Sequence, residues 1–489
     1  MRRVTLGVDS RTQSTKVLAV DVEAGEEVAE GRASHTGADV QDPRDWWNAL
    51  VAATRQMSLD GLDVAGLAVG GQQHGLVTLD ASAEPVRHAP LWNNVASAAD
   101  AERLNRLADF PEAVGSLLVA SITIAKLAHL ARTAPGDLDR SAAICLPHDY
   151  LNLRLTGELA TDRGEASGSG WWSPAEGRIR RDLLALAVGE AATERLRLPE
   201  VRGPEEIAGR LTREAAAELG LPVGIPVGPG SGDNPMAAVG IGAEVGEAVV
   251  SLGTSGVAYA VSERPSADES GEVAGFADAT GRFLPLACML NCTRVVDVIA
   301  AMFGMPLPKA LDRAAMMTPG AGGLVMLPYL GGERTPNLPR ATGSLSGVTA
   351  SNATLDHLVR AALDGVAAGI AYCLDALSRV GVAPRELTLV GGGARHPAWR
   401  QAIADATGLP VSVRAGAEHV ARGAAIQVAA IVRGETVASL AAARRPAVTA
   451  EVAPRPEFRE AFQLDVRRRM ILDLKAFAAA EPAAPTTGV

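Results

Sequence analysis

The sequence predicts an α/β protein with more than one domain. The chain has 489 residues, which is more than one hydrophobic core usually serves. Segments typical of strands and of helices alternate along it, as they do in α/β architectures. A strand–turn–strand unit near the N-terminus also has a counterpart of similar chemistry in the second half of the chain. Such a repeat favours a duplicated domain, although one short repeat by itself leaves that interpretation open.

The N-terminal half opens with two short apolar strands at residues 4–9 and 16–21, joined by a polar turn. We therefore expect a hairpin. Asp42 followed by Pro43 predicts the start of a helix, because Asp is a preferred N-cap and Pro fits the first helical position. Another apolar strand is expected at residues 64–69, and it leads into a glycine-rich turn.

The second half repeats this organisation. A strand is expected at residues 247–252, a tight turn at 253–256 and a returning strand at 257–261. A later strand at 386–390 runs into three glycines, and a helix follows from Pro397. The glycine-rich stretch 240–246 predicts a boundary between domains at 1–240 and 241–477. The tail, residues 478–489, is rich in Ala, Pro and Thr and is predicted to be disordered.

Composition restricts the kinds of partner. Apolar residues make up 47% of the chain, and 46 Lys and Arg against 56 Asp and Glu give a formal charge of −10. With no basic stripe, the sequence argues against a nucleic-acid or anionic-membrane surface. Small nucleotides stay compatible with this charge, because backbone amides and Mg²⁺ bind them without net positive charge.

Cysteine usage and the N-terminus indicate a cytoplasmic protein. The four cysteines are predicted to be buried thiols and not metal ligands or disulfides, because no His/Cys cluster with zinc spacing surrounds them. The N-terminus leads directly into a strand with no signal-peptide pattern. We expect no segment with the roughly 18 apolar residues that span a bilayer. The oligomeric state is left open, with a homodimer among the alternatives.

Three small-residue turns after strands suit phosphate binding. Without bulky side chains, backbone amides approach a phosphate closely and hydroxyl groups add donors. The first turn carries Asp9 and Thr12, and a carboxylate such as Asp9 could hold Mg²⁺. The second is Gly253-Thr254-Ser255-Gly256, and the third is Gly391-Gly392-Gly393-Ala394. Taken alone, the first two are more often simple hairpin turns, and the third is equally explained as a tight strand-to-helix turn. The third is neither a G-x-G-x-x-G nor a Walker loop.

The loop Gly228-Pro-Gly-Ser-Gly-Asp233-Asn234 is the most informative one. Its glycines leave Asp233 with few bulky neighbours at what is expected to be a helix N-terminus, where the helix would tend to keep the carboxylate ionised. A carboxylate in this setting could take the proton from a substrate hydroxyl. The alternative is an ordinary N-cap, which is common for Asp.

Two polar groups are candidates for recognising sugar hydroxyls. Gln73 and His74 lie between glycines, and Trp92-Asn93-Asn94 follows a short apolar run. Indole rings stack on sugar faces, and amides and imidazoles exchange hydrogen bonds with hydroxyls. Taken singly, His74 is as well explained as a turn histidine.

These motifs occur in the order found in one family. The chain resembles the FGGY carbohydrate kinases over about residues 1–475. The residues that carry the resemblance are VDSRTQSTK at 8–16, GQQHG at 71–75, LWN at 91–93, LPHDYL at 146–151, GDN at 232–234, SLGTSG at 251–256, LPYLGGERTP at 327–336, GSLSG at 343–347 with HLVRAALD at 357–364, and GGGA at 391–394.

The resemblance implies two actin-like (ribonuclease-H-like) domains with a catalytic cleft between them. It implies that the acceptor sugar binds the N-terminal domain at Gln73, His74, Trp92, Asn93, Asp233 and Asn234. It implies that ATP binds mainly the C-terminal domain at Gly253, Thr254, Gly392, Gly393 and Ala394, with Thr12 opposite. The family's catalytic base corresponds to Asp233, and its metal-proximal acid corresponds to Asp9.

The resemblance also implies an activity, namely transfer of a phosphoryl group from MgATP to a sugar hydroxyl. The Q-x-H-G pattern at Gln72–Gly75 is most similar to members that phosphorylate D-xylulose at its terminal hydroxyl. The alternatives are a kinase for another ketose or polyol, such as ribulose or gluconate, and a non-catalytic nucleotide-binding protein of the same fold. Asp233 argues against the last, because such a protein needs no carboxylate there.

The sequence departs from the family pattern at three positions. Arg11 replaces a glycine in the first phosphate turn, Asn94 replaces an Asp, and His129 replaces a Trp. The Arg11 guanidinium either contacts the phosphates or leans outward into solvent or onto a surface carboxylate. We favour the second, because a long side chain leaves a crowded turn readily.

Overall fold

The computed structural model describes residues 1–461, so the tail at 478–489 lies outside the described part of the chain. Contacts between residues divide the chain into two units. Unit 1 comprises residues 1–244, 261–285 and 418–446, and unit 2 comprises residues 245–260, 286–417 and those from 447 onward. Two segments of the second half therefore belong with the first half.

Unit 1 is built on a mixed sheet whose strands run in the order β13-β14-β5-β1-β2-β3, with β15 also paired to β5. The predicted hairpin is confirmed, because β1 and β2 pair antiparallel from Val4 opposite Asp21 to Ser10 opposite Thr15. The strands are β1 (Arg2–Ser10), β2 (Ser14–Asp21), β3 (Glu27–Ser34), β5 (Leu62–Gly71), β13 (Gly209–Arg210), β14 (Pro226–Val227) and β15 (Ser231–Gly232).

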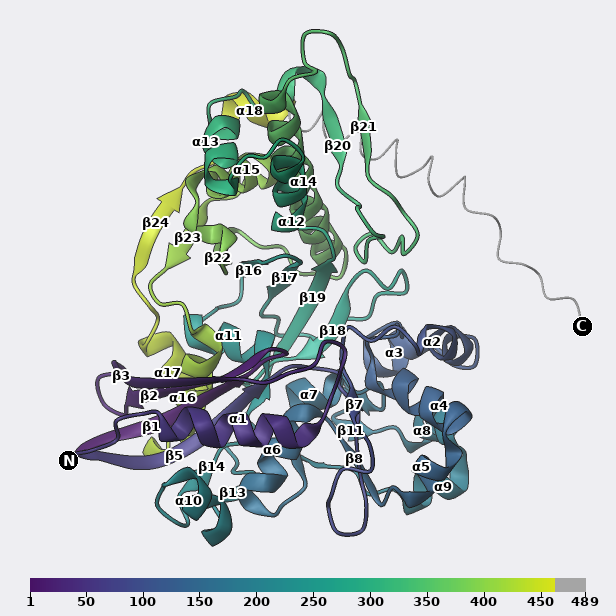
Figure 1. Ribbon diagram of the computed structural model, residues 1–489, viewed down its shortest axis with the longest axis vertical. Coiled ribbons are helices and arrows are strands. Elements are labelled where there is room, and N and C mark those ends of the chain that lie inside the picture. The colour runs from purple at the N-terminus through teal and green to yellow at the C-terminus, as the bar shows by residue number, and fades with distance from the viewer. Residues whose placement is uncertain (462–489) are drawn as a thin grey trace, which may run out of the picture. The chain divides into compact units, whose positions relative to one another are not determined.

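The two faces of this sheet are covered by different helices, α1 (Pro43–Arg55) and α16 (His419–Arg433). Successive side chains of a strand point to opposite faces. Val4, Leu6 and Val8 of β1 share a core with Trp46 and Leu50 of α1. Figure 1 shows α1 running along the strands of this sheet.

The opposite face of β1 meets α16. The Thr5 hydroxyl donates to the carbonyl of Ala425 at 3.0 Å, and Leu18 and Val20 of β2 pack on Ala421 and Ala425. Because Asp9 has the same parity as Thr5, the strand geometry directs its side chain to the α16 side. The alternation of side chains along β1 thus determines that Asp9 faces α16.

The start of α1 agrees with its prediction. Asp42 is the N-cap, its carboxylate accepts from the Arg44 amide at 3.0 Å, and Pro43 is the first helical residue. Trp46 and Trp47 are buried against the sheet. The sequence signals for this helix lie within the helix and its N-cap, so the sequence alone was enough to predict where it starts.

The remaining elements of unit 1 surround this sheet. Its short strands are β4 (Val40–Gln41), β6 (Val77–Leu79), β7 (Ala89–Pro90), β8 (Ala143–Cys145), β9 (Ala160–Asp162), β10 (Trp172–Ser173), β11 (Arg178–Ile179), β12 (Glu200–Arg202) and β18 (Ala274–Ala277). Its other helices are α2 (Ala98–Asn105), α3 (Phe110–Val114), α4 (Thr123–Thr133), α5 (Pro135–Arg140), α6 (Pro147–Thr156), α7 (Arg163–Ser167), α8 (Arg181–Val188), α9 (Glu190–Arg195), α10 (Arg213–Leu219), α11 (Asp233–Ile241) and α17 (Val437–Ala443).

The sheet of unit 2 has the same internal connectivity as that of unit 1. Its first strand, β16 (Glu247–Leu252), pairs antiparallel with β17 (Gly256–Ala260) and parallel with β22 (Glu386–Val390). In unit 1, β1 pairs antiparallel with β2 and parallel with β5. This agreement confirms the predicted α/β fold with two actin-like domains.

The other strands and helices of unit 2 extend this sheet and cover it. The strands that extend the sheet are β19 (Phe283–Met289, which enters from unit 1), β23 (Val411–Arg414) and β24 (Val448–Val452), whereas β20 (Val325–Leu327) and β21 (Ser344–Ser346) form a separate two-stranded sheet. The helices are α12 (Thr293–Met302), α13 (Leu307–Ala315), α14 (Leu355–Arg379), α15 (Pro397–Thr407), α18 (Pro456–Ala461) and the 3₁₀ turns η1 (Ala321–Gly323) and η2 (Gly393–Arg395).

One helix of unit 2, α14, is long and apolar enough to satisfy a length-and-composition test for a membrane span. The expectation that no segment reaches this level was wrong. Of its most apolar window, 83% is buried inside the protein, and α14 packs on α12, α13 and α15. Burial on all sides accounts for its composition. The helix pair α16 and α17 meets the same test only jointly, and it is bent by 117°.

Two helices of unit 1 cross with their backbones in contact. A Cβ atom built on Gly423 of α16 would lie 1.9 Å from the carbonyl oxygen of Met236 in α11, and one built on Gly240 of α11 would lie 1.9 Å from the carbonyl oxygen of His419. No side chain fits in this crossing. The position of α11, which begins at Asp233, therefore depends on glycine at both residues.

Gly423→Ala should lower the stability of the protein by about 1–3 kcal/mol, because the added methyl group must push two backbones apart. This cost exceeds the gain of about 1 kcal/mol that Ala brings to a helix. Thermal or urea denaturation measures it. Gly136→Ala is the matched control, because it also lies in a helix and its Cβ would meet nothing within 4 Å. Equal stability of the two variants would contradict the proposed crossing.

Candidate active site

Two of the predicted acids lie at neighbouring strand ends in unit 1. Strand β5 pairs in parallel with β1, where Asp9 is opposite Gly70, and with β15, where Ser231 is opposite the same Gly70. Asp233 follows β15 directly at the start of α11. Because adjacent strands lie about 4.8 Å apart, this register brings Asp9 and Asp233 to one edge of the sheet. Their negative charges interact, and each is affected by Arg11.

Asp9 is buried and pairs with Arg11. The Arg11 Nε atom lies 2.6 Å from Asp9 Oδ2, and the side chains are 52% and 3% exposed. Burial raises the pKa of Asp9 to about 7, although the guanidinium acts in the opposite direction. The expectation that Arg11 leans into solvent or onto a surface carboxylate was wrong, since its partner is the buried Asp9. A buried charge needs a counter-ion, and Asp9 attracts the nearest cation.

Asp9 and Arg11 open into a hollow of about 560 Å³ within unit 1. Thr12, Trp92 and Asn93, all predicted as ligand-binding residues, line it too, together with Lys16 and Glu418. The Trp92 indole is 41% exposed, and its Nε1 donates to the Thr12 hydroxyl at 3.0 Å. Asn93 donates to the carbonyl of Ala38 at 3.2 Å.

Sequence reasoning missed the second polar group of this hollow. Lys16 Nζ lies 3.0 Å from Glu418 and 3.1 Å from Glu30. Glu418 immediately precedes α16, far along the chain from the first turn. Lys16 was part of the motif at residues 8–16, but nothing local in the sequence indicates that Glu418 lies beside it.

Asp233 is the first residue of α11, and Gly232 takes the N-cap position. The alternative of an Asp N-cap was therefore wrong. Its Oδ1 accepts from the backbone amide of Asn234 at 2.7 Å and from the Asn234 side chain at 3.0 Å. Burial raises the pKa of Asp233, against the lowering effects of Arg11 and of the Asn234 amide. We had expected the helix N-terminus to lower the pKa of Asp233 and keep it ionised. Burial raises this pKa by more.

Gln73 and Asn234 connect the two predicted sugar-binding segments. The Asn234 side chain donates to Gln73 Oε1 at 3.5 Å, and the Gln73 side chain is buried. Its Nε2 atom is a buried donor that meets no acceptor in good hydrogen-bond geometry among the described residues, although the Gln73 side chain acts on the Glu165 carboxyl and tends to lower its pKa. A buried amide donor without a partner is costly, so a polar ligand atom or water fits there.

His74 is held in one orientation. Its backbone has φ of 67°, a conformation that non-glycine residues adopt rarely. Its Nδ1 lies 3.0 Å from the carbonyl of Gly168, and its ring lies against Phe276 with centroids 5.4 Å apart. Burial lowers the pKa of His74 to about 4. The ring is therefore neutral at pH 7 with the proton on Nδ1, which leaves Nε2 as an acceptor.

The predicted nucleotide residues meet in a cavity of unit 2. Gly253 and Thr254 from the turn after β16 and Gly392 and Gly393 from the turn after β22 line one hollow of about 490 Å³. Its other walls come from residues that sequence reasoning did not single out, namely Leu307, Pro308 and Leu311 of α13 with Thr293, Arg395, His396 and Trp399. Ala394 is buried and does not line the cavity.

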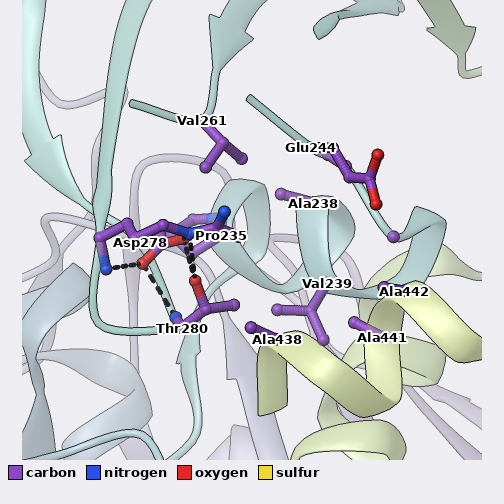
Figure 2. Close-up of a pocket in the computed structure, with 13 residues that line it drawn as sticks. Pro235, Ala238, Val239, Glu244, Val261, Asp278, Thr280, Ala438, Ala441 and Ala442 are labelled. Atoms are coloured by element: carbon purple, nitrogen blue, oxygen red, sulfur yellow. Dashed lines mark hydrogen bonds and ion pairs between the residues drawn. The ribbon is translucent and has the colours of Figure 1, made fainter. Parts of the chain in front are cut away.

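A third hollow, in unit 1, carries none of the predicted residues. It lies between α11 and α17 and is lined mainly by small or apolar residues, with Asp278 as its buried acid (Figure 2). Asp278 accepts from the amides of Thr280 and Arg282 and from the Thr280 hydroxyl, at 2.9, 2.6 and 2.5 Å. A carboxylate bonded three times to its own turn is structural.

The residues around Asp9 fit a divalent cation. Asp9 Oδ1 is buried and has no hydrogen-bond partner in the described part of the chain. Within residues 1–461, no group of three or more His, Cys, Asp or Glu side chains is arranged to hold a metal ion. Mg²⁺ commonly takes one or two carboxylates and completes its shell with water and substrate phosphates. A single carboxylate at Asp9 matches this mode of binding.

Comparisons with known proteins decide the family. Residues 4–240 match the N-terminal domain, and residues 248–431 the C-terminal domain, of the FGGY family of carbohydrate kinases. The chain belongs to this family. It is therefore a carbohydrate kinase, and the resemblance drawn from its motifs is confirmed. The turns of both units and the loop around Asp233 belong to an enzyme that transfers a phosphoryl group.

Similar proteins share both the sequence and the fold of this kinase. A xylulose kinase of Streptomyces rubiginosus is 46% identical over 447 residues, which is 90% of each chain. The crystal structure of a xylulose kinase from Bifidobacterium adolescentis is 37% identical, with a TM-score of 0.85, covering 94% of this chain and 99% of that one. A structure from Brucella ovis reported as a xyloylose kinase is 29% identical, with a TM-score of 0.91, covering 98% and 100%.

Asp9→Asn should make this kinase more stable above pH 7 while it loses activity. The folded-state pKa of Asp9 is about 7 against an ordinary value of 3.8, so the folded state holds a proton that the unfolded state releases. Stability therefore falls as pH rises from about 4 to 7, by about 4 kcal/mol for a difference of about three pKa units. Asn at position 9 cannot ionise, so the variant does not lose this stability as the pH rises.

Thermal denaturation at pH 4 and at pH 8 measures the difference. We expect a raised Tm of the Asp9→Asn variant at pH 8 and little change at pH 4. Asp63→Asn, at an exposed carboxylate of β5, serves as the control and should change neither. A Tm of Asp9→Asn below that of the parent protein at pH 8 would show that the ion pair with Arg11 outweighs the burial of the charge.

Proposed function

We propose that this carbohydrate kinase transfers the γ-phosphoryl group of ATP to the terminal hydroxyl of D-xylulose, giving D-xylulose 5-phosphate and ADP. The observation that carries the proposal is the carboxylate of Asp233 at the edge of the sheet, next to Asp9 and bonded to Asn234. The choice of sugar is supported by the relatives named xylulose kinases. Since the reaction consumes ATP, the cytoplasm is the proposed compartment.

Asp233 is the proposed general base. It accepts the proton of the sugar hydroxyl as the oxygen attacks the phosphorus atom. Its pKa is raised by burial, which strengthens it as a base as long as it is ionised at the working pH. Gln73, His74 and Asn234 are proposed to hold the sugar, with the Gln73 amide as donor and His74 Nε2 as acceptor. Trp92 and Asn93 are proposed to bind the sugar from the hollow that holds Asp9.

Asp9 is proposed to hold Mg²⁺ directly or through water, and the ion when bound neutralises charge on the transferred phosphates. Thr12 and the amides of Gly253 and Thr254 are proposed to hold phosphate oxygens. Gly392 and Gly393, with Ala394 behind them, are proposed to line the nucleotide site. In this division, residues 1–240 bind the sugar and contribute Asp9 and Thr12 to the phosphates, and residues 241–477 bind the rest of the nucleotide. Catalysis then depends mainly on positioning and electrostatics.

A panel of acceptors tests the sugar. With MgATP, D-xylulose should give a larger kcat/KM than L-ribulose, gluconate or glycerol, because the polar groups around Gln73 and His74 are assigned to its hydroxyls. A coupled assay for ADP measures all four under the same conditions. If another acceptor gives the larger kcat/KM, the D-xylulose assignment is wrong, while the carbohydrate kinase assignment is unaffected.

Asp233→Ala tests the base. We expect kcat to fall by about 10²- to 10⁴-fold, the usual contribution of a positioned acid–base group. The fold should persist, because a helix-terminal contact is worth only about 1 kcal/mol. Nucleotide affinity, measured by fluorescence with a labelled ADP, should stay within a factor of two to three. Asp60→Ala, at an exposed carboxylate, is the control. Near-normal activity of Asp233→Ala would mean that Asp233 is only structural.

A further inference from the structure

The loop that carries Asp233 is attached to the rest of unit 1 at every residue before it. The carbonyl of Pro229 is 2.7 Å from His148 Nε2 and accepts from Asn152 at 2.9 Å. Gly230 exchanges two hydrogen bonds with the side-chain amide of Gln427, at 2.9 and 3.1 Å. Ser231 donates to Asp162 at 2.6 Å, and β15 pairs with β5. Asp233 therefore has its position set by a polar network made of other residues of unit 1.

His148 is the member of this network whose charge matters. It lies in α6 and is completely buried. Its Nε2 faces the Pro229 carbonyl, and its Nδ1 faces Asp149 Oδ1 at 3.0 Å. A carbonyl oxygen and a carboxylate oxygen are both acceptors, so each ring nitrogen needs a proton. A neutral ring leaves one pair of acceptors in contact within the protein interior, which is unfavourable.

The groups around the ring stabilise its positive charge. On α6, Asp149 is buried, and its other oxygen accepts from the Leu146 amide at 2.8 Å. From β9, Asp162 is close enough to act on the ring by its charge. The 228–230 loop contributes only the Pro229 carbonyl, and Gly71 of β5 packs on the His148 Cβ. The Asn152 amide nitrogen, which donates to the same Pro229 carbonyl, lies 3.2 Å from Nε2 and contributes no acceptor there. Asp149 and the Pro229 bond raise the pKa of His148 against the effect of burial.

The loop leaves no room for another arrangement. A Cβ atom on Gly230 would lie 2.2 Å from His148 Nε2 and 2.2 Å from the carbonyl of Val69, and Gly230 has φ of +73°. Glycine is required there both for the backbone conformation and for the approach to the ring. The ring and the loop backbone thus fit against each other, and movement of one must move the other.

We propose that His148 is a buried imidazolium that acts as a positioning residue, fixing the loop at Pro229 so that Asp233 meets the substrate hydroxyl, and that loss of its proton at alkaline pH releases the loop. Below that pH both ring protons are bonded and the loop is held. Above it, one of the two bonds is lost and Asp233 is displaced. The role assigned to Asp233 rests on the proposed function, whereas the charge of the ring does not.

Nitrogen NMR of the intact, unmodified enzyme tests the charge. In protein labelled with ¹⁵N-histidine, both ring nitrogens of His148 should show protonated shifts at pH 7.5. His35 is the internal control, because it is also buried but burial lowers its pKa, so it should be neutral in the same spectrum. The His148 signal is assigned by its loss in His148→Gln. A spectrum with one bare ring nitrogen in His148 at pH 7.5 overturns the proposal.

Two substitutions test the positioning. His148→Gln removes the charge and keeps one donor, so kcat should fall about 10- to 100-fold, as expected for a displaced catalytic group, with the nucleotide KM nearly unchanged. His148→Lys restores a cation with several donors and should recover most of kcat. It should also shift the alkaline limit of kcat to higher pH, because Lys loses its proton near pH 10.4.

The assays use whichever sugar the acceptor panel identifies, so a wrong choice of sugar does not affect this result. Equal kcat values and equal alkaline limits in the Gln and Lys variants, with circular dichroism unchanged, would overturn the proposal. If neither variant folds, the NMR measurement on the unmodified enzyme still decides the charge of His148.

Discussion

The parallel pairing of β5 with strands on both of its sides is the interaction on which the candidate site depends. On one side β5 pairs with β1, whose second-last residue is Asp9, and on the other with β15, which leads into Asp233. Parallel strands end at the same edge of a sheet, so residues from distant parts of the chain meet there. The helices α11 and α16 cross through Gly240 and Gly423, which keeps α11, and with it Asp233, close to the sheet.

Burying several carboxylates close together costs electrostatic free energy, and nearby cationic side chains reduce this cost for some of them. The pKa values of Asp9, Asp233, Asp162 and Glu165 are all raised, in each case mainly by burial. Arg11 is paired with Asp9, and His148 with Asp149. Glu165 lies among three other acids, and the Gln73 side chain opposes the resulting rise of its pKa. Unit 1 therefore gives up stability by keeping these carboxylates buried and close together.

Unit 2 has the same strand connectivity as unit 1 but carries different residues at the ends of its strands. In place of acids, the ends of β16 and β22 carry small residues, and the cavity beside them is walled by apolar residues of α13. Backbone amides and apolar walls suit a nucleotide, which has phosphates at one end and a flat ring at the other. The shared connectivity of the two sheets thus supports one polar and one mainly apolar hollow.

The sequence by itself determined the parts of this protein that depend on neighbours along the chain. The strands of both hairpins, the Asp42 cap of α1 and the glycine-rich turns follow from local preferences, and the ordered motifs indicated the family. Only the tertiary structure decided the rest. Glu418 lies beside Lys16, and Gln427 binds Gly230, because folding joins segments far apart in sequence. Arg11 pairs with Asp9, only two residues away, because folding buries that carboxylate beside it. Burial, which reversed the expected ionisation of Asp233, is likewise a property of the whole fold, since it depends on every segment that displaces water from the carboxylate.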